Sequence, residues 1–175
     1  AGATVVIVAR RPDPVRETAA HLQLAGVRAF GLPLDVRDAD AITTAVLRDH
    51  GVPDILVNAA GINPRPHMDT ITLKDWEETI AVNLTAPFAL GQKFGPAMAQ
   101  RGSGRIVNVV SQQAFRAFGN SGAYGASKGG LVSLTRSQAE AWSPRGVLCN
   151  AVAPGLVDTA MTTAVIADEA KAKAH

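Results

Sequence analysis

Tyr124 and Lys128 lie four residues apart in the segment S-G-A-Y-G-A-S-K-G-G, and Ser111 precedes them in the chain. On a helix, residues at this spacing share one face about one turn apart, so the phenol and the ammonium can share a pocket. A free phenol has a pKa of about 10, and a fixed positive charge nearby lowers that pKa by favouring the phenolate. A tyrosine tuned in this way can take a proton from an alcohol or give one to a carbonyl. The pair alone does not decide a function, because this spacing also occurs by chance on exposed helices.

The elements that must position this pair alternate between apolar, β-branched runs and helical patterns. Such alternation predicts an α/β fold with a parallel sheet covered by helices on both faces. We expect strands at 4–8, 27–34, 54–58, 105–110 and 147–151. We expect helices at 14–25, 38–50, 73–101 and 123–142, and a polar helix over the last residues. Pro87 and Pro96 are expected to kink or divide the third helix.

Length and composition indicate one globular domain over residues 1–175. Apolar residues make up 47% of the chain and charged residues 18%, and the net charge is +2. The basic residues are scattered, which argues against a nucleic-acid-binding face. No apolar run reaches the roughly 18 residues that cross a bilayer, so we expect a cytoplasmic protein with no membrane partner. The histidines show no metal-ligand spacing, so no metal is expected, and Cys149 is expected to be a buried strand residue.

Small or polar residues follow every expected strand, where open parallel sheets bind their ligands. Each could be a turn former by itself, but their recurrence at all the strand ends predicts a ligand site along one edge of the sheet. The residues concerned are Ala9-Arg10-Arg11, Asp35-Val36, Asn58-Ala59-Ala60-Gly61, Ser111 and Pro154-Gly155.

These motifs, together with Asn83 and Thr159, resemble the ordered motif set of the short-chain dehydrogenase/reductase family, as far as about Met161. The resemblance implies a Rossmann-like doubly wound sheet and an NAD(P)-dependent oxidoreductase of the common, non-extended branch. Such an enzyme transfers hydride between a nicotinamide cofactor and a small ketone or secondary alcohol. The segment that begins G-I-N-P-R-P looks most like sugar-acid or polyol dehydrogenases and 3-oxoacyl reductases of the family.

The resemblance also implies roles for individual residues. Tyr124 would be the general acid/base, and Lys128 would lower its pKa and bind the nicotinamide ribose. Ser111 would hold the substrate oxygen, with Gln113 as a further substrate contact or a turn cap. Asn83 would order a water that relays protons from Lys128. The cofactor would contact Arg10, Asp35, Val36, Asn58, Ala59, Gly61, Tyr124, Lys128, Pro154, Gly155, Val157 and Thr159.

The end of the first expected strand bears on the choice of cofactor. Relatives that prefer NAD usually carry Asp there, which pairs with the ribose hydroxyls and repels a 2′-phosphate. Here the position is Ala9, followed by Arg10, whose guanidinium can grip a 2′-phosphate. NADP(H) is therefore favoured and NAD(H) stays possible. The alternative is that Arg10 and Arg11 only solvate the strand end.

The chain departs from the family pattern at both ends. The family begins with a strand and a glycine-rich T-G-x-x-x-G-x-G turn, which is not found here, and it continues past a substrate lid into a further strand and helix. In the doubly wound order 3-2-1-4-5-6 that first strand is the central one. Its absence would separate the first two strands of this chain from the other three. We therefore expect an excerpt of a longer chain, incomplete at both ends.

Two alternatives to this enzyme stay open. An enoyl reductase of the same family would space its tyrosine and lysine more widely than is seen here. A non-catalytic dinucleotide-binding or structural subunit would usually have lost one of the four catalytic positions. The family also implies a homodimer or homotetramer, formed through the helices that carry Asn83 and Tyr124. Ordinary packing within one chain would explain the small residues on those helices equally well.

Overall fold

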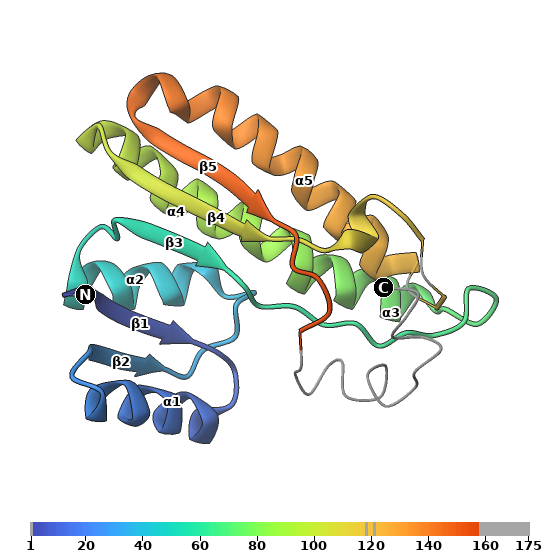
Figure 1. The fold of residues 1–175 in the computed structure, drawn as a ribbon, viewed down its shortest axis with the longest axis horizontal. Helices are drawn as coiled ribbons and strands as arrows, with labels where there is room; N and C mark the ends of the chain where they lie inside the picture. Colours follow the sequence, from blue (N-terminus) through green and yellow to red (C-terminus); the bar gives the residue numbers. More distant parts are fainter. Residues whose placement is uncertain (1, 118, 121, 158–175) are drawn as a thin grey trace.

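The computed structural model describes residues 2–117, 119–120 and 122–157. Strands and helices alternate along them (Figure 1). The strands are β1 (Thr4–Val8), β2 (Arg28–Leu32), β3 (Ile55–Asn58), β4 (Gly104–Val109) and β5 (Val147–Val152). The α-helices are α1 (Pro12–Leu24), α2 (Ala39–His50), α3 (Leu73–Ile80), α4 (Ala86–Arg101) and α5 (Gly122–Trp142). Every expected strand is therefore present. The polar helix expected over the last residues lies outside the described part of the chain.

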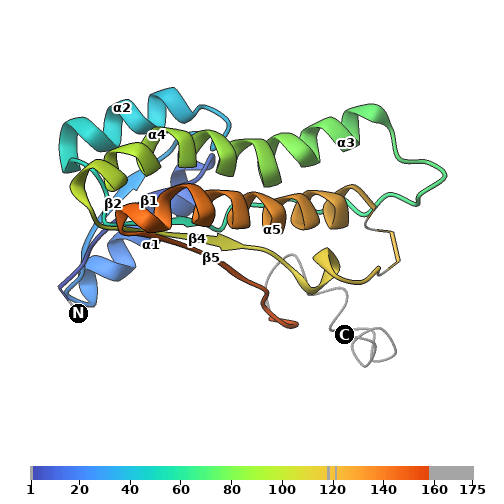
Figure 2. The same cartoon turned by 90° about the horizontal axis from the view of Figure 1, so that it is seen from above.

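The described strands form two separate parallel sheets. One pairs β1 with β2, and the other has the order β3-β4-β5. This is the division that the sequence predicted from the doubly wound order. All five arrows point the same way (Figure 1), so the carboxyl ends of the strands lie along one edge. Figure 2 shows α1 on one side of the sheets and α2, α4 and α5 on the other.

The main core lies between the sheets and the three helices α2, α4 and α5. Buried residues from all of these elements pack into one cluster that includes Ile42, Phe94, Met98, Ile106 and Trp142. The opposite face of the second sheet is open in the described structure. Four apolar residues of this sheet are exposed there: Ile55, Val57, Leu148 and Val152. The apolar residues on the buried face of the second sheet pack against α4 and α5.

Local signals explain where the helices begin. The Asp38 side chain accepts a hydrogen bond from the backbone N–H of Ala41, which caps α2. Thr72 and Asp75 form a reciprocal capping box at the start of α3. None of the helices in the described part of the chain is both long and apolar enough to cross a membrane.

The expected helix over 73–101 is interrupted directly before Pro87 and continues through Pro96. The change occurs at a π-helical turn, η1 (Ala81–Thr85), which joins α3 to α4 and contains Asn83. Pro87 lies in the first turn of α4, where its missing N–H costs little. Pro96 is accommodated inside α4. The expected division therefore occurs beside Pro87, as a wide turn around a buried asparagine, and does not occur at Pro96.

Small residues of α4 make room for side chains of α5 in the same chain. A Cβ atom added at Gly95 would lie 2.5 Å from Cη2 of Trp142. One added at Gly91 would lie 2.4 Å from Nε2 of Gln138. Packing within one chain therefore explains these glycines, and the expected homo-oligomer stays a prediction that they do not support.

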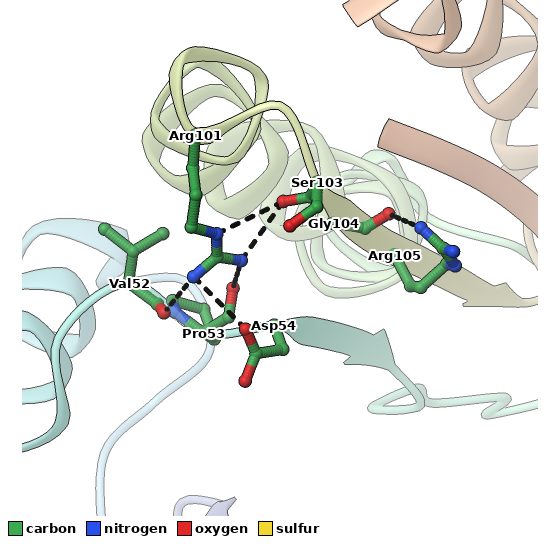
Figure 3. A network of polar contacts seen from close by, with 7 residues as sticks. All are labelled: Val52, Pro53, Asp54, Arg101, Ser103, Gly104 and Arg105. Atoms are coloured by element: carbon green, nitrogen blue, oxygen red, sulfur yellow. Dashed lines mark hydrogen bonds and ion pairs between the residues drawn. The ribbon is translucent and has the colours of Figure 1, made fainter. Parts of the chain in front are cut away.

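Arg101 links the segments that lead into β3 and β4, at the amino ends of these strands (Figure 3). Its guanidinium donates to the carbonyl oxygens of Val52, Pro53 and Ser103 over 3.0–3.1 Å. It also forms an ion pair of 3.2 Å with Asp54. One planar side chain thus satisfies three backbone acceptors that neither strand can pair.

We predict that Gly95→Ala destabilises the protein, because its methyl group would overlap the Trp142 ring. Overpacking of this kind costs about 1–3 kcal/mol. The matched control is Gly129→Ala in α5, whose Cβ would meet only Ala114 O at an ordinary 3.7 Å. This control should be neutral or stabilising by up to about 1 kcal/mol, because alanine favours helix. Thermal or urea denaturation of both variants checks this, and equal stability of the two would contradict it.

Candidate functional site

Tyr124 and Lys128 lie one turn apart near the start of α5, as their spacing predicted. Lys128 Nζ lies 5.7 Å from the centre of the Tyr124 ring. It donates a hydrogen bond of 2.8 Å to the backbone carbonyl oxygen of Val109, the last residue of β4. Ser111 follows two residues later. The bond therefore ties the part of α5 that carries the pair to the strand end that carries Ser111.

Burial changes the chemistry of Lys128. Its side chain is only 3% exposed, which is unusual for a lysine. Desolvation disfavours the ammonium and lowers the pKa of Lys128 to about 8. Its proton is therefore held far less tightly than that of a solvated lysine, and at neutral pH the group is still mostly charged. The positive charge of Lys128 thus lies close to the Tyr124 ring.

Asn83 holds the loop after β3 against the same region. Its Oδ1 accepts from the backbone N–H of Ile62 at 2.8 Å, and its Nδ2 donates to the Ile62 carbonyl at 2.9 Å. The same Nδ2 donates to Ser127 Oγ at 3.1 Å. A Cβ added at Gly61 would lie 3.4 Å from Asn83 Oδ1 and 3.6 Å from Lys128 Nζ. Gly61, Asn83 and Lys128 thus meet, and the π-helical turn is what brings the asparagine there.

Ser111 begins the short 3-10 helix η2 (Gln112–Ala114). Its Oγ accepts from the backbone N–H of Gln113 at 3.2 Å, so it caps this turn while its side chain stays partly accessible. Gln112 turns instead toward Arg116, and its Oε1 accepts a hydrogen bond of 3.2 Å from the Arg116 guanidinium. Gln113 Oε1 is buried and has no hydrogen-bond partner within the described residues. Of the two glutamines, Gln113 therefore has the free acceptor.

Arg10 and Asp35 lie near each other at the ends of β1 and β2. Both Asp35 oxygens are bound by the Arg37 guanidinium, at 3.0 and 2.6 Å. These bonds, with smaller help from the charge of Arg10, lower the pKa of Asp35 to about 2. Asp35 is thus a fixed anion that already has a partner, a contact the sequence did not predict. Val36, beside it, is half-buried.

The residues expected to contact the cofactor after β3 divide into two kinds. Asn58 is 6% exposed, and its Nδ2 donates to Asn108 Oδ1 at 2.8 Å, so its side chain turns into the protein interior. Ala59 is exposed and Gly61 half-buried, so their backbone stays open to a ligand.

Pro154, Gly155 and Val157 follow β5 at the same edge of the sheet. Gly155 approaches the Gln112 side chain, since a Cβ there would lie 3.7 Å from its Nε2. Thr159 lies outside the described residues.

The loop after Gly61 holds two polar groups that the sequence did not single out. Arg65 has a left-handed φ of 57°, although the residue before a proline favours extended backbone. Asn63 Oδ1 and Arg65 Nε are buried and lack hydrogen-bond partners within the described part of the chain. In the sequence, only the two prolines that flank Arg65 could have pointed to this loop, because they restrict its backbone. Strain and unpaired polar atoms together are typical of ligand sites.

No group of three His, Cys, Asp or Glu side chains in the described ranges could hold a metal ion. The thiol of Cys149 is buried in β5, and burial raises its pKa.

We predict that Lys128→Met raises the melting temperature at pH 7, because it removes a buried charge. Between pH 8 and 10.5 the unfolded chain holds a proton that folded Lys128 has released, so the free energy of unfolding rises with pH there. The cost of the charge is thus present in full below about pH 8, at up to about 3 kcal/mol, and it vanishes toward pH 10.5. The difference in melting temperature between Lys128→Met and the wild type should therefore shrink as the pH rises.

Thermal melts at pH 7 and pH 10 check this prediction. Lys74→Met, at an exposed position of α3, is the control, and its melting temperature should differ from that of the wild type by the same amount at both pH values. A constant gap for Lys128→Met would contradict the assigned burial cost.

Comparison with known proteins was made for the whole chain. The family profile described as short chain dehydrogenase matches residues 1–170. The gluconate 5-dehydrogenase of Gluconobacter oxydans is 36% identical over 171 residues, which cover 96% of this chain and 67% of that protein. The 3-oxoacyl-[acyl-carrier-protein] reductase FabG of Aquifex aeolicus is 37% identical, with coverage of 99% and 71%. This chain thus spans about two thirds of the length of these relatives.

A solved structure agrees with the sequence matches. A gluconate 5-dehydrogenase from Burkholderia cenocepacia J2315, in complex with NADP and tartrate, superposes with a TM-score of 0.90 at 31% identity. The superposition covers 97% of this chain and 68% of that one. The Rossmann-like fold expected from the motifs is therefore confirmed. The chain belongs to the short-chain dehydrogenase/reductase family, whose members are NAD(P)-dependent oxidoreductases.

Proposed function

We propose that this protein interconverts a small ketone and the corresponding secondary alcohol, with NADP(H) as the preferred cofactor and Tyr124 as the general acid/base. The observation that carries the proposal is the buried ammonium of Lys128, which lies beside the Tyr124 ring and is bonded to the strand end that precedes Ser111. A buried cation is costly unless it has a task or a partner. Here its task is to stabilise the negative charge left on Tyr124 when that residue gives up its proton.

The residues at this edge suit a nicotinamide cofactor. The backbone at Gly61 has no side chain and lies close to Lys128 Nζ, which leaves room for a ribose whose hydroxyls the ammonium could bind. Arg10, beside the Asp35–Arg37 pair, offers a cation for a phosphate group. When bound, the cofactor supplies or accepts the hydride.

The protein's own residues then handle the oxygen and the proton. In the reduction direction, the Ser111 hydroxyl donates to the substrate carbonyl oxygen and stabilises the charge that grows on it. Tyr124 gives its proton to that oxygen, and the Lys128 charge stabilises the phenolate that remains. Asn83 keeps Gly61 and Ile62 in place beside Lys128 through its bonds to the Ile62 backbone. Its proposed relay water would need the remaining acceptor capacity of Oδ1.

A carboxylate-bearing substrate, such as a sugar acid, is the class we propose. Two of the relatives are named gluconate 5-dehydrogenase, and the solved one contains tartrate, a hydroxy acid. The partly buried Arg65 in the strained loop after Gly61 supplies a cation without a partner among the described residues. An arginine in this state is well suited to bind a carboxylate in a bidentate manner.

A 3-oxoacyl thioester is the second candidate, because FabG matches the chain at similar identity. A non-catalytic dinucleotide-binding or structural subunit is the remaining alternative. The presence of all four catalytic side chains speaks against it.

We predict that the intact protein oxidises NADPH with 5-keto sugar acids, and that Tyr124→Phe lowers kcat at least about 100-fold. This is the usual contribution of a positioned acid/base group. Both proteins should be assayed with a sugar acid, an uncharged ketose and a 3-oxoacyl thioester, since the panel separates the substrate classes. A thermal melt serves as the folding control and should be the same for both proteins, and an NADPH titration of each establishes that the cofactor is bound.

Retention of most turnover by Tyr124→Phe would overturn the assigned mechanism. Binding of NADPH without turnover on any substrate would favour the non-catalytic alternative. Faster turnover of the thioester would replace the sugar acid as substrate class.

We also predict that Arg10→Gln raises KM for NADPH about tenfold and leaves KM for NADH nearly unchanged. The lost contact is a charge-assisted bond to the 2′-phosphate, which NADH does not carry. Arg16→Gln is the control, because Arg16 is an exposed arginine of α1 paired with Asp13. Equal effects of Arg10→Gln on both cofactors would show that Arg10 only solvates the strand end.

A further inference from the structure

Near its amino end, helix α5 closely approaches the turn after β4. Cβ atoms added at Gly125 and Gly129 would lie 3.1 and 3.7 Å from the carbonyl oxygens of Gln113 and Ala114. Steric fit, such as that of Trp142 against Gly95, already limits where α5 can lie. Directional hydrogen bonds add a second constraint on the position of α5 along the strands.

Four buried polar side chains provide such bonds, and we call them the buried amide chain: Asn58, Asn108, Thr135 and Gln138. Each of them is at most 6% exposed. Asn58 Nδ2 donates to Asn108 Oδ1 at 2.8 Å, across the paired strands β3 and β4. Asn108 Nδ2 then donates to Thr135 Oγ1 at 2.9 Å and to Gln138 Oε1 at 3.1 Å, both on α5. The chain thus runs from β3 through β4 into the helix.

The bonds of the buried amide chain follow one another in a single direction. Because Asn108 Oδ1 accepts from Asn58, its two N–H groups must face α5. Thr135 donates its own proton to the Leu131 carbonyl at 2.7 Å, which leaves its oxygen to accept from Asn108. Displacement of α5 by part of a turn would leave buried donors and acceptors unpaired, which is unfavourable in a protein interior.

The far end of the buried amide chain lies against α4. Gln138 Nε2 is buried without a partner among the described residues. A Cβ added at Gly91 would lie 2.4 Å from this nitrogen, so the glutamine fits only because residue 91 has no side chain. The bond that Gln138 Oε1 accepts from Asn108 therefore orients its side chain.

We propose that the buried amide chain sets the position of α5 along β4, and so makes Asn108, Thr135 and Gln138 positioning residues for Tyr124 and Lys128. The inference rests on the proposed function of that pair. On the helix, Thr135 lies two turns beyond Lys128, about 10 Å along the axis. Lys128 itself is bonded to Val109, the neighbour of Asn108 in β4. Two attachments to adjacent strand residues therefore fix both the rotation and the axial position of the reacting end.

The test uses the intact protein and the variant pair Thr135→Val with Gln138→Leu, which removes both acceptors of Asn108 without loss of volume. We expect kcat to fall about tenfold or more, since small displacements of reacting groups have large effects. We also expect the pKa of Lys128, followed by NMR of labelled lysine, to shift upward because the displaced ammonium gains water. The single variant Thr135→Ser keeps the hydroxyl, so its kcat and its Lys128 pKa should equal those of the wild type.

The control is Val147→Ala, a buried apolar truncation in β5 that contacts the same helix without a polar bond. It should lower the melting temperature by a comparable amount and leave kcat and the Lys128 titration unchanged. If the variant pair Thr135→Val with Gln138→Leu behaves like this control, the buried amide chain is only structural and the proposal is overturned.

The Lys128 titration does not depend on turnover, so the two proposals can fail separately. A shifted titration in a protein whose Tyr124→Phe variant keeps its activity would uphold the positioning and reject the acid/base role. An unshifted titration with an inactive Tyr124→Phe variant would do the reverse.

Discussion

The hydrogen bond from the Lys128 ammonium to the Val109 carbonyl is the interaction on which the site depends. A charge this deeply buried loses most of its hydration, and only a well-placed acceptor reduces that loss. The bond joins the helix that carries Tyr124 to the strand that leads to Ser111. The same desolvation that weakens the hold of Lys128 on its proton also strengthens its field at the neighbouring phenol. One contact thus determines both the geometry and the electrostatics of the candidate acid/base group.

Around this bond, polar side chains set positions and apolar side chains supply cohesion. Asn83 binds both backbone groups of Ile62, which holds the loop after β3 against Lys128. A regular α-helical turn would present its residues with a different spacing, and the π-helical turn is the local adjustment that accompanies this contact. The large apolar residues fill space and fit only where small residues leave room, as Trp142 does against Gly95. The buried amides and the Lys128 ammonium add directional bonds to this steric fit.

Much of this arrangement could be predicted from the sequence. The order of strands and helices follows from the periodicity of apolar residues, which is a local property. The shared face of Tyr124 and Lys128 follows from helical geometry, and the gathering of polar strand ends follows from the parallel direction of the strands. Even the division into two sheets could be derived, because strand order is a property of the fold family. What these inferences have in common is that each needs only neighbours in the chain or a known topology.

The remaining features depend on contacts between distant segments, and only the tertiary structure decided them. The side chain of Asn58 turns inward because its partner Asn108 lies fifty positions away in the sequence. The Arg37 guanidinium binds both oxygens of Asp35, a pairing that the sequence did not predict. The long helix is interrupted by the π-helical turn that contains Asn83, directly before Pro87, and it continues through Pro96. The sequence by itself determined which groups reach the edge of the sheet. The tertiary structure decided how the buried polar groups pair, because each must find its partner wherever the fold places it.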